Sequence, residues 1–265
     1  MSQAFVDIHC HLLPGIDDGA ASMAEAQAMA AMARSDGTAA VICTAHQLGR
    51  YAHNLGEDIR RQTATLQEHL TAAGIDLAVL PGADVRIEEG MIDMLARGDV
   101  LTLADRGRHV LLELPHELYF PIEGLLESLR QRSIVGILSH PERNAGLLRQ
   151  PPMVARLVDA GCLMQVTAGS LMGTFGPASQ QMAEWMLAEG LVHFMATDAH
   201  GVRARRPLMR RAFDRVGELT DDATARSLCC DFPARVAAGL EVACGRQVVA
   251  RKPSGWRALF ARKAA

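Results

Sequence analysis

The chain has 265 residues, 49% hydrophobic and 22% charged, and 27 basic against 30 acidic side chains give a formal net charge of −3. This length fits one α/β barrel or at most two domains, and the charge argues against a general nucleic-acid binder. No apolar run reaches the roughly 18 residues of a membrane-spanning helix. The opening MSQAFVDIHCH leads directly into a strand pattern and does not resemble a signal peptide, so we expect a cytoplasmic protein.

Short apolar runs alternate with longer helical patterns along the chain. The runs predict seven strands, at 5–11, 39–45, 77–84, 109–114, 134–139, 163–167 and 192–197. The patterns between them predict helices at 23–34, 55–73, 92–96, 122–131, 153–160 and 177–188. Ser22 followed by Glu25 three residues later is typical of a capping box at the start of the first helix.

Strands that alternate with helices indicate a parallel sheet with helices outside it. Seven strands fit a single-domain, distorted (β/α)7 TIM-like barrel, and an open doubly wound sheet is the alternative. A glycine-rich phosphate loop does not follow the first strand, so the sequence indicates no nucleotide site. We assign 1–245 to the barrel and 246–265 to a basic C-terminal tail, where Trp256, Leu259 and Phe260 recur at helical spacing.

Metal-binding residue types gather where the predicted strands end. Six of the seven strands deliver such side chains there: His9 and His11, His46, Asp84, Glu113, His140, and Asp198 with His200. The C-terminal ends of parallel barrel strands converge on one face, which is where active sites form. Imidazoles and carboxylates together suit zinc, manganese and iron(II), and this set is large enough for two or three ions. Taken singly, His140 is also explained as a turn residue and Glu113 as an ion-pair partner.

Several segments resemble one known family. They are DIHCHLLPGIDDGA at 7–20, TAHQLGRY at 44–51, PGADVRI at 81–87, SHPERN at 139–144, QVTAGSLMGTFG at 165–176 and ATDAHGVRARRP at 196–207. Together they resemble the polymerase and histidinol phosphatase (PHP) superfamily. The finer match is to its manganese-dependent bacterial protein tyrosine phosphatases of capsule and exopolysaccharide synthesis, the CpsB/CapC/YwqE type.

The resemblance implies three divalent metal ions in a PHP-type barrel. It implies Mn²⁺, and Fe²⁺ or Zn²⁺ would suit the same donors. The implied ligands are His9, His11, Asp17, His46, Asp84, Glu113, His140, Asp198 and His200. Asp17 is assigned by the resemblance alone, because it lies in the loop after the first strand. Two positions depart from the family pattern, with Asp84 in place of the usual Glu and Gln47 in place of a second His.

Metal-assisted phosphomonoester hydrolysis is the chemistry that this set favours. Arg143 and Arg206 follow strand ends, so we predict that they neutralise phosphoryl oxygens, with surface ion pairs as the alternative. Arg50 and Tyr51 are predicted to contact the substrate at the pocket mouth, although ordinary loop residues would look the same. None of the six cysteines has an arginine five or six residues later in a phosphate loop. We therefore expect structural thiols and no cysteine nucleophile.

The resemblance also implies a partner, the phosphotyrosine-containing tail of a membrane-bound bacterial tyrosine kinase that controls polysaccharide export. The enzyme alternative is a PHP phosphoesterase acting on a small phosphate such as histidinol phosphate. The alternative outside enzymes is a non-catalytic metal-binding regulator of a kinase. The basic tail is predicted to touch an anionic membrane surface weakly, or else to be solvated or docked on the barrel. The remaining histidines, among them His109 and His193, are expected to be surface or packing residues.

Overall fold

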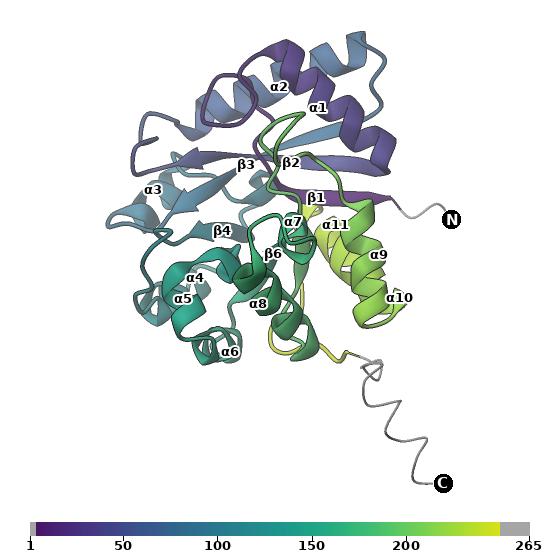
Figure 1. Ribbon diagram of the computed structural model, residues 1–265. Helices are drawn as coiled ribbons and strands as arrows, with labels where there is room; N and C mark the ends of the chain where they lie inside the picture. The colour runs from purple at the N-terminus through teal and green to yellow at the C-terminus, as the bar shows by residue number, and fades with distance from the viewer. Residues whose placement is uncertain (1–3, 250–265) are drawn as a thin grey trace, which may run out of the picture.

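A computed structural model describes residues 4–249 and shows one sheet of seven parallel strands, joined in chain order (Figure 1). All seven predicted strands are confirmed, with ends that differ by up to two residues. They are β1 (Phe5–Cys10), β2 (Thr38–Gln47), β3 (Ala78–Arg86), β4 (His109–Glu113), β5 (Val135–Ser139), β6 (Leu163–Thr167) and β7 (Phe194–Ala196).

The first and last strands meet at their C-terminal ends. The backbone N–H of His11 donates to Ala199 O at 2.9 Å, and that of Asp198 donates to His9 O at 2.7 Å. Further down, the Asp7 carboxylate accepts from the backbone N–H of Thr197 at 3.0 Å. These bonds curl the sheet into the predicted distorted (β/α)7 barrel and decide against an open sheet.

Helices cover the outside of the barrel (Figure 1). They are α1 (Met23–Asp36), α2 (Gly56–Ala72), α3 (Met91–Arg97), α4 (Glu123–Arg130), α5 (Ala145–Arg149), α6 (Pro152–Asp159), α7 (Ala168–Leu171), α8 (Pro177–Ala188), α9 (Arg210–Leu219), α10 (Asp222–Arg226) and α11 (Phe232–Ala237). The predicted cap is confirmed, because Ser22 Oγ accepts from the Glu25 N–H at 3.3 Å. The sequence did not predict the last three helices. These three helices follow β7 in the chain, where α9 packs against α10 and α11 packs against β1.

The hydrophobic core has two layers. The inner layer fills the barrel below the strand ends and includes Ile8, Leu111 and Phe194, while the outer layer lies between strands and helices and includes Phe5 and Cys10. Ile8 and Cys10 would share a face in a regular strand. They do not here, because the pairing of β1 with β2 is irregular between Asp7 and Cys10. The irregularity lets apolar side chains fill the barrel lower down while His9 and His11 face its interior at the top.

Among residues 4–249, no helix is both long enough and apolar enough to cross a membrane. Most of the predicted basic tail, including Trp256, Leu259 and Phe260, lies outside the described residues. The boundary at residue 245 and the role of the tail therefore stay predictions.

Candidate metal centre

Nine metal-type side chains meet at the C-terminal ends of the strands. Their ligand atoms form four overlapping groups, each spanning no more than 4.8 Å: His11, Asp18, His46 and His200; His9, His11 and Asp84; His9, His140 and Asp198; and His46, Asp84 and Glu113. Because the groups share members, the donors make one continuous cluster. Eight of these residues are among those expected from the sequence, and Asp18 is the addition.

Hydrogen bonds fix the orientation of two buried histidines of the cluster. His9 Nδ1 lies 2.8 Å from Gln165 Oε1, and His11 Nδ1 lies 2.8 Å from Asp17 Oδ2. Both partners are acceptors, so each Nδ1 carries the proton. The two Nε2 atoms, 3.2 Å apart, then point into the cluster, which is the arrangement of imidazoles that bind metals.

One carboxylate of the cluster, Asp84, lacks an internal hydrogen-bond partner among the described residues. Both oxygens of Asp84 are buried without a hydrogen bond from any described residue. Burial, together with the Asp84 charge, raises the pKa of Glu113 to about 8. Such crowding of acids inside a protein is costly unless cations neutralise it. The donors therefore fit divalent cations.

The histidines respond to this environment in different ways. Burial lowers the pKa of His11 to about 4 and that of His140 to about 3, and electrostatic interactions with the neighbouring His200 and Arg143 respectively act in the same direction. Burial also disfavours charge on His9, but the carboxylates of Asp198 and Asp84 outweigh it and raise its pKa to about 9. His11 and His140 are thus neutral near pH 7, the form in which an imidazole binds a metal, whereas His9 would have to give up its second proton to a bound cation.

Backbone strain coincides with the site. His140 has φ of 35° and Asp198 has φ of 49°. Positive φ is uncommon outside glycine, and it persists where surrounding structure imposes it. At both positions the unusual backbone directs a side chain from the end of a strand into the cluster.

Asp17 and Asp18 take different positions. The Asp17 carboxylate lies behind His11, and it also accepts from the backbone N–H groups of Gly19 at 2.9 Å and His46 at 3.0 Å. Asp18 Oδ1 instead lies 3.4 Å from His46 Nε2 and 3.5 Å from His200 Nε2. Asp18 is 43% exposed, so it marks the open side of a cluster that is otherwise buried.

Two glutamines near the site differ in role. Gln165 on β6 is fully buried and holds His9, a contact that motif reasoning missed. Its signal was a lone amide between the apolar residues Met164 and Val166. Gln47 faces away from the cluster and ties β2 to a neighbouring loop, because its side chain bonds Asn54 O, Asp99 O and the Leu101 N–H. The departure at Gln47 therefore leaves the described cluster untouched.

Two arginines converge on Asp198. Arg143 Nη1 donates to Asp198 Oδ2, and Arg205 Nη2 lies 2.5 Å from the same oxygen. Arg143 also packs flat on the Phe175 ring, with its guanidinium carbon 4.0 Å from the ring centroid. The exposed side chain of Arg206 lines a neighbouring pocket instead.

A small pocket opens beside the exposed side of the cluster. Its volume is about 210 Å³, and His46, Arg50, Tyr51, Arg86 and Glu113 line it. The Tyr51 ring stacks on His46 at 5.3 Å with an interplanar angle of 15°, and Arg50 lies 4.9 Å above the Tyr51 ring. Arg50 and Tyr51 thus both line this pocket, and their contact with a substrate stays a prediction.

The cysteines lie away from this chemistry. Five are buried and Cys244 is exposed, and all six are free thiols. Burial raises the pKa of Cys10 well above its usual range and that of Cys162 to about 12. A thiol nucleophile must ionise, so these environments argue against cysteine-based catalysis.

The fold and the cluster together define a class: a barrel of parallel strands whose C-terminal ends carry histidines and carboxylates suited to metal ions. Residues 5–238 match the family described as "Capsular polysaccharide synthesis, CpsB/CapC". The chain therefore belongs to the CpsB/CapC family, as the sequence motifs indicated.

Named relatives agree with this family. The chain is 34% identical over 202 residues to tyrosine-protein phosphatase YwqE of Bacillus subtilis, covering 76% of this chain and 79% of that protein. It is 28% identical over 210 residues to a putative tyrosine-protein phosphatase, CapC of Staphylococcus aureus, covering 79% and 82%. One solved structure comes from work on YwqE of Bacillus subtilis and CpsB of Streptococcus pneumoniae, which are described as metal-dependent tyrosine phosphatases. It superimposes on this chain with a TM-score of 0.86 and is 28% identical to it in sequence. It covers 94% of this chain and 100% of that one.

Proposed function

We propose that the protein is a metal-dependent protein tyrosine phosphatase. The observation that carries this is the cluster of histidines and carboxylates beside two arginines that converge on Asp198, in a chain whose relatives bear that name. Arginines beside a multi-metal site suit phosphoryl transfer, where positive charge must neutralise the phosphoryl oxygens.

Three divalent ions, Mn²⁺ by preference, are proposed for the four overlapping donor groups, and Fe²⁺ or Zn²⁺ would suit the same donors. Bound there, they would supply a water of lowered pKa and Lewis-acid stabilisation of the phosphoryl group. The ligands that we propose are the nine residues of the cluster: His9, His11, Asp18, His46, Asp84, Glu113, His140, Asp198 and His200. Asp17, expected as a ligand, is proposed instead to orient His11 through the bond to its Nδ1.

Arg143 and Arg205 are the arginines proposed to bind the phosphoryl oxygens. Both arginines form ion pairs with Asp198, which is one of the proposed ligands. A substrate phosphate held at the cluster would therefore lie close to both guanidinium groups. The phosphoryl-binding role predicted from the sequence for Arg206 is here proposed for its neighbour Arg205. A guanidinium can bind two phosphate oxygens at once, which favours one orientation of the substrate.

Tyr51 and Arg50 are proposed to receive the aromatic part of the substrate at the pocket mouth. The Tyr51 ring, stacked on His46, offers an aromatic face next to the cluster. The leaving phenol has a pKa of about 10, so departure of the tyrosyl oxygen needs little help from an acid.

The substrate that we propose is a phosphotyrosine in the tail of a bacterial tyrosine kinase of capsule or exopolysaccharide synthesis. The family description names capsular polysaccharide synthesis, and the named relatives are tyrosine phosphatases. Action on such a tail places the enzyme in the cytoplasm. Weak contact of the basic tail with anionic membranes is part of this proposal, and deletion of 251–265 should then weaken liposome binding.

Comparison of three substrates tests the function. Protein reconstituted with Mn²⁺ is assayed on a phosphotyrosine peptide, on histidinol phosphate and on p-nitrophenyl phosphate. We expect turnover of the peptide and of p-nitrophenyl phosphate. Activity confined to histidinol phosphate would make the protein a small-molecule phosphoesterase, and binding of the peptide without turnover under any metal would make it a regulator. Metal analysis of protein purified without added metal identifies the ions.

A further inference from the structure

A second, larger pocket lies next to the cluster. Its volume is about 470 Å³, within the range of about 300–1,000 Å³ that small-ligand pockets occupy. The walls come from the segment after β6 and from the loop that leads from β7 into α9. We call it the arginine pocket and define it by Met172, Phe175, Arg203, Arg205, Arg206 and Arg211.

The charge of this pocket is one-sided. Four arginines line it, and no aspartate or glutamate is among the described residues of its wall. Arg203, Arg206 and Arg211 form no ion pair with any residue from 4 to 249, and the buried Nε of Arg205 has no acceptor among them. These guanidinium groups therefore have donors to spare for an anion.

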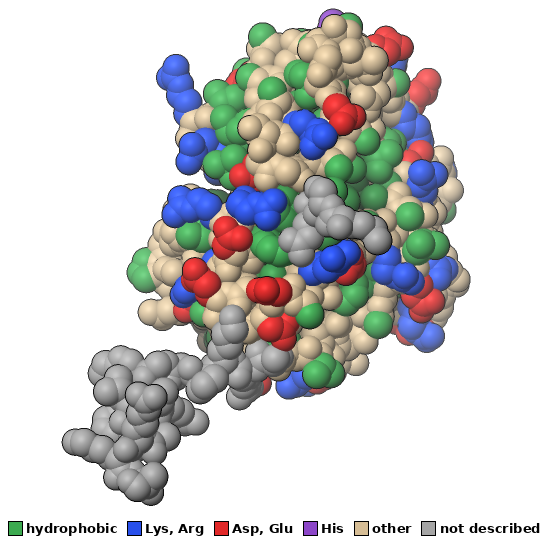
Figure 2. Space-filling model, turned by 90° about the vertical axis from the view of Figure 1, so that its right-hand side faces the viewer, with side chains coloured by type: hydrophobic (Ala, Val, Ile, Leu, Met, Phe, Trp, Pro, Cys, Tyr) green, Lys and Arg blue, Asp and Glu red, His purple; other side chains and the backbone are tan. Residues whose placement is uncertain are grey.

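Elsewhere on the surface, arginines are commonly paired. Arg34 lies 3.0 Å from Asp76, Arg60 lies 2.7 Å from Asp105, and Arg215 lies 2.9 Å from Glu184. Over the lower half of the face drawn in Figure 2, acidic and basic side chains are interspersed. Arg132 and Arg149 bond backbone carbonyls and, among residues 4–249, also form no ion pair. The pocket is therefore set apart by the gathering of four arginines around one cavity whose described wall holds no acid.

Apart from Thr174 and Thr197, the rest of the wall has no polar side chain. Met172 contributes a thioether and Phe175 an aromatic ring. The guanidinium carbon of Arg143 lies 4.0 Å from the centroid of the Phe175 ring. An apolar wall combined with a rim of guanidinium groups suits a ligand that has an aromatic ring at one end and a multiply charged anion at the other. A phosphotyrosine side chain has both features.

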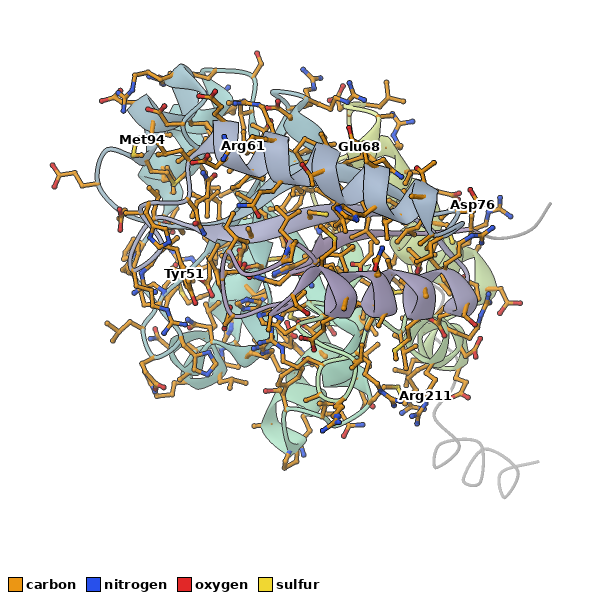
Figure 3. All side chains as sticks on the ribbon, turned by 90° about the horizontal axis from the view of Figure 1, so that it is seen from above. Tyr51, Arg61, Glu68, Asp76, Met94 and Arg211 are labelled. Carbon is orange, nitrogen blue, oxygen red and sulfur yellow. The ribbon has the colours of Figure 1, made fainter. Side chains whose placement is uncertain are left out.

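The arginine pocket adjoins the catalytic cluster through Arg205. That side chain lines the pocket and also lies 2.5 Å from Asp198 Oδ2. None of the nine proposed ligands is among the residues that line it. The arginine pocket and the pocket at Tyr51 share no lining residue. Viewed from above, Tyr51 lies at the left of the molecule and Arg211 at the lower right (Figure 3).

We propose that the arginine pocket binds a second phosphotyrosine of the substrate chain while the first is held at the metal centre. This rests on the proposed phosphatase function and adds a preference for substrates with neighbouring phosphotyrosines. Because the pocket and the cluster share Arg205, both groups are within reach of one extended peptide segment.

Peptides with one cleavable group test the proposal. Each carries a phosphotyrosine and, at increasing spacing from it, a phenylalanine, a glutamate or the non-hydrolysable phosphonomethyl-phenylalanine. With the Mn²⁺-loaded full chain, we expect the phosphonate at its best spacing to lower KM about tenfold relative to phenylalanine, which corresponds to about 1.4 kcal/mol, with kcat unchanged. Glutamate should recover only a small part of this gain, because it lacks the ring.

Matched variants assign the gain to this pocket. Arg203→Gln/Arg211→Gln should raise KM for the phosphonate peptide to the phenylalanine value and leave turnover of p-nitrophenyl phosphate unchanged. Arg215→Gln, on the same helix as Arg211 but paired with Glu184, should keep the gain. Circular dichroism confirms that the variants are folded.

Three outcomes would overturn the proposal: equal KM for the phosphonate and phenylalanine peptides, a gain that survives in the double variant, or a glutamate peptide as good as the phosphonate. Failure of the phosphatase function is seen separately, because the phenylalanine peptide would then not be hydrolysed. In that case, calorimetry still measures the affinity of the phosphonate peptide for the protein, and comparison with Arg203→Gln/Arg211→Gln still tests whether the arginine pocket binds it.

Discussion

Two buried histidines at opposite ends of the barrel, His9 and His109, have pKa values that are shifted in opposite directions. At the C-terminal end of the strands, carboxylates outweigh burial and raise the pKa of His9 to about 9. At the N-terminal end, His109 begins β4, and burial with the nearby Arg108 lowers its pKa to about 4. Burial likewise lowers the pKa of His193 to about 4, although its ring bonds the Met164 N–H and Gly245 O.

The difference shows that burial alone does not make a histidine functional. His109 is fully buried, and neither of its ring nitrogens has a hydrogen-bond partner among the described residues. It packs as a neutral ring, which agrees with the expectation from sequence that it is a packing residue. Histidines become a candidate metal site where neighbouring strands bring carboxylates to the same place, and the following predictions test that contrast.

Removal of metal should have the largest effect on activity and stability. The effect should come from the cluster at the C-terminal ends of the strands and not from His109 or His193 at the other end. We expect a chelator to abolish phosphatase activity and to lower the melting temperature, because cations that bind only the folded state stabilise it by about 2.7 kcal/mol at a hundredfold excess over Kd. Thermal unfolding with and without added Mn²⁺ measures this. Identical melting curves and undiminished activity in the chelator would contradict a metal centre.

Asp84→Asn should lower kcat/KM by about 10²–10³, because it removes a charge whose oxygens have no other described partner. Asp84→Glu keeps the charge and restores the residue usual in the family, so it should retain most activity. Asp159→Asn is the exposed control, because Asp159 lies far from the cluster in sequence and pairs with Arg246 at 3.4 Å. Steady-state kinetics on the phosphotyrosine peptide compares them. An active Asp84→Asn enzyme would remove Asp84 from the ligand set.

Gln165→Leu should weaken metal binding by about 10–100-fold, since His9 loses the acceptor that orients its ring. Gln165→Glu retains an acceptor at that position and should bind metal more tightly than the leucine variant. Metal titration followed by calorimetry gives the affinity directly and does not depend on turnover. Equal affinities for the wild type and Gln165→Leu would show that Gln165 does not position His9.

The smallest effect is expected at the opposite end of the barrel. His109→Phe removes two unpartnered ring nitrogens, so it should stabilise the protein by about 1 kcal/mol near neutral pH. His193→Phe is the matched control and should destabilise, because the native ring makes two hydrogen bonds.

The gain at His109 should grow as pH falls. The folded-state pKa of about 4 lies below the usual histidine value of 6.5, so the unfolded chain binds the proton more readily. The stability that the neutral ring provides is complete above pH 6.5 and is lost toward pH 4, by roughly 3 kcal/mol in all. Denaturant unfolding of both proteins between pH 7.5 and pH 4.5 checks the sign. A difference that is constant with pH would contradict a buried neutral His109.

The sequence alone determined the barrel and eight of the nine cluster residues. It did so because strand periodicity is local, and because parallel strands necessarily bring their C-terminal ends to one face. His46 and His140 are found this way although they are far apart in the chain. The family motifs then narrowed the chemistry to phosphate esters.

Only the tertiary structure decided which of two adjacent loop residues turns inward. Asp18 joins the cluster while Asp17 supports His11, and Arg205 meets Asp198 while Arg206 faces the arginine pocket. No periodicity orients side chains in such loops. Their directions follow from backbone turns and from partners distant in sequence, and the same holds for the bond between Gln165 and His9, 156 residues apart. Local pattern fixes where strands end, and three-dimensional packing fixes what each end presents.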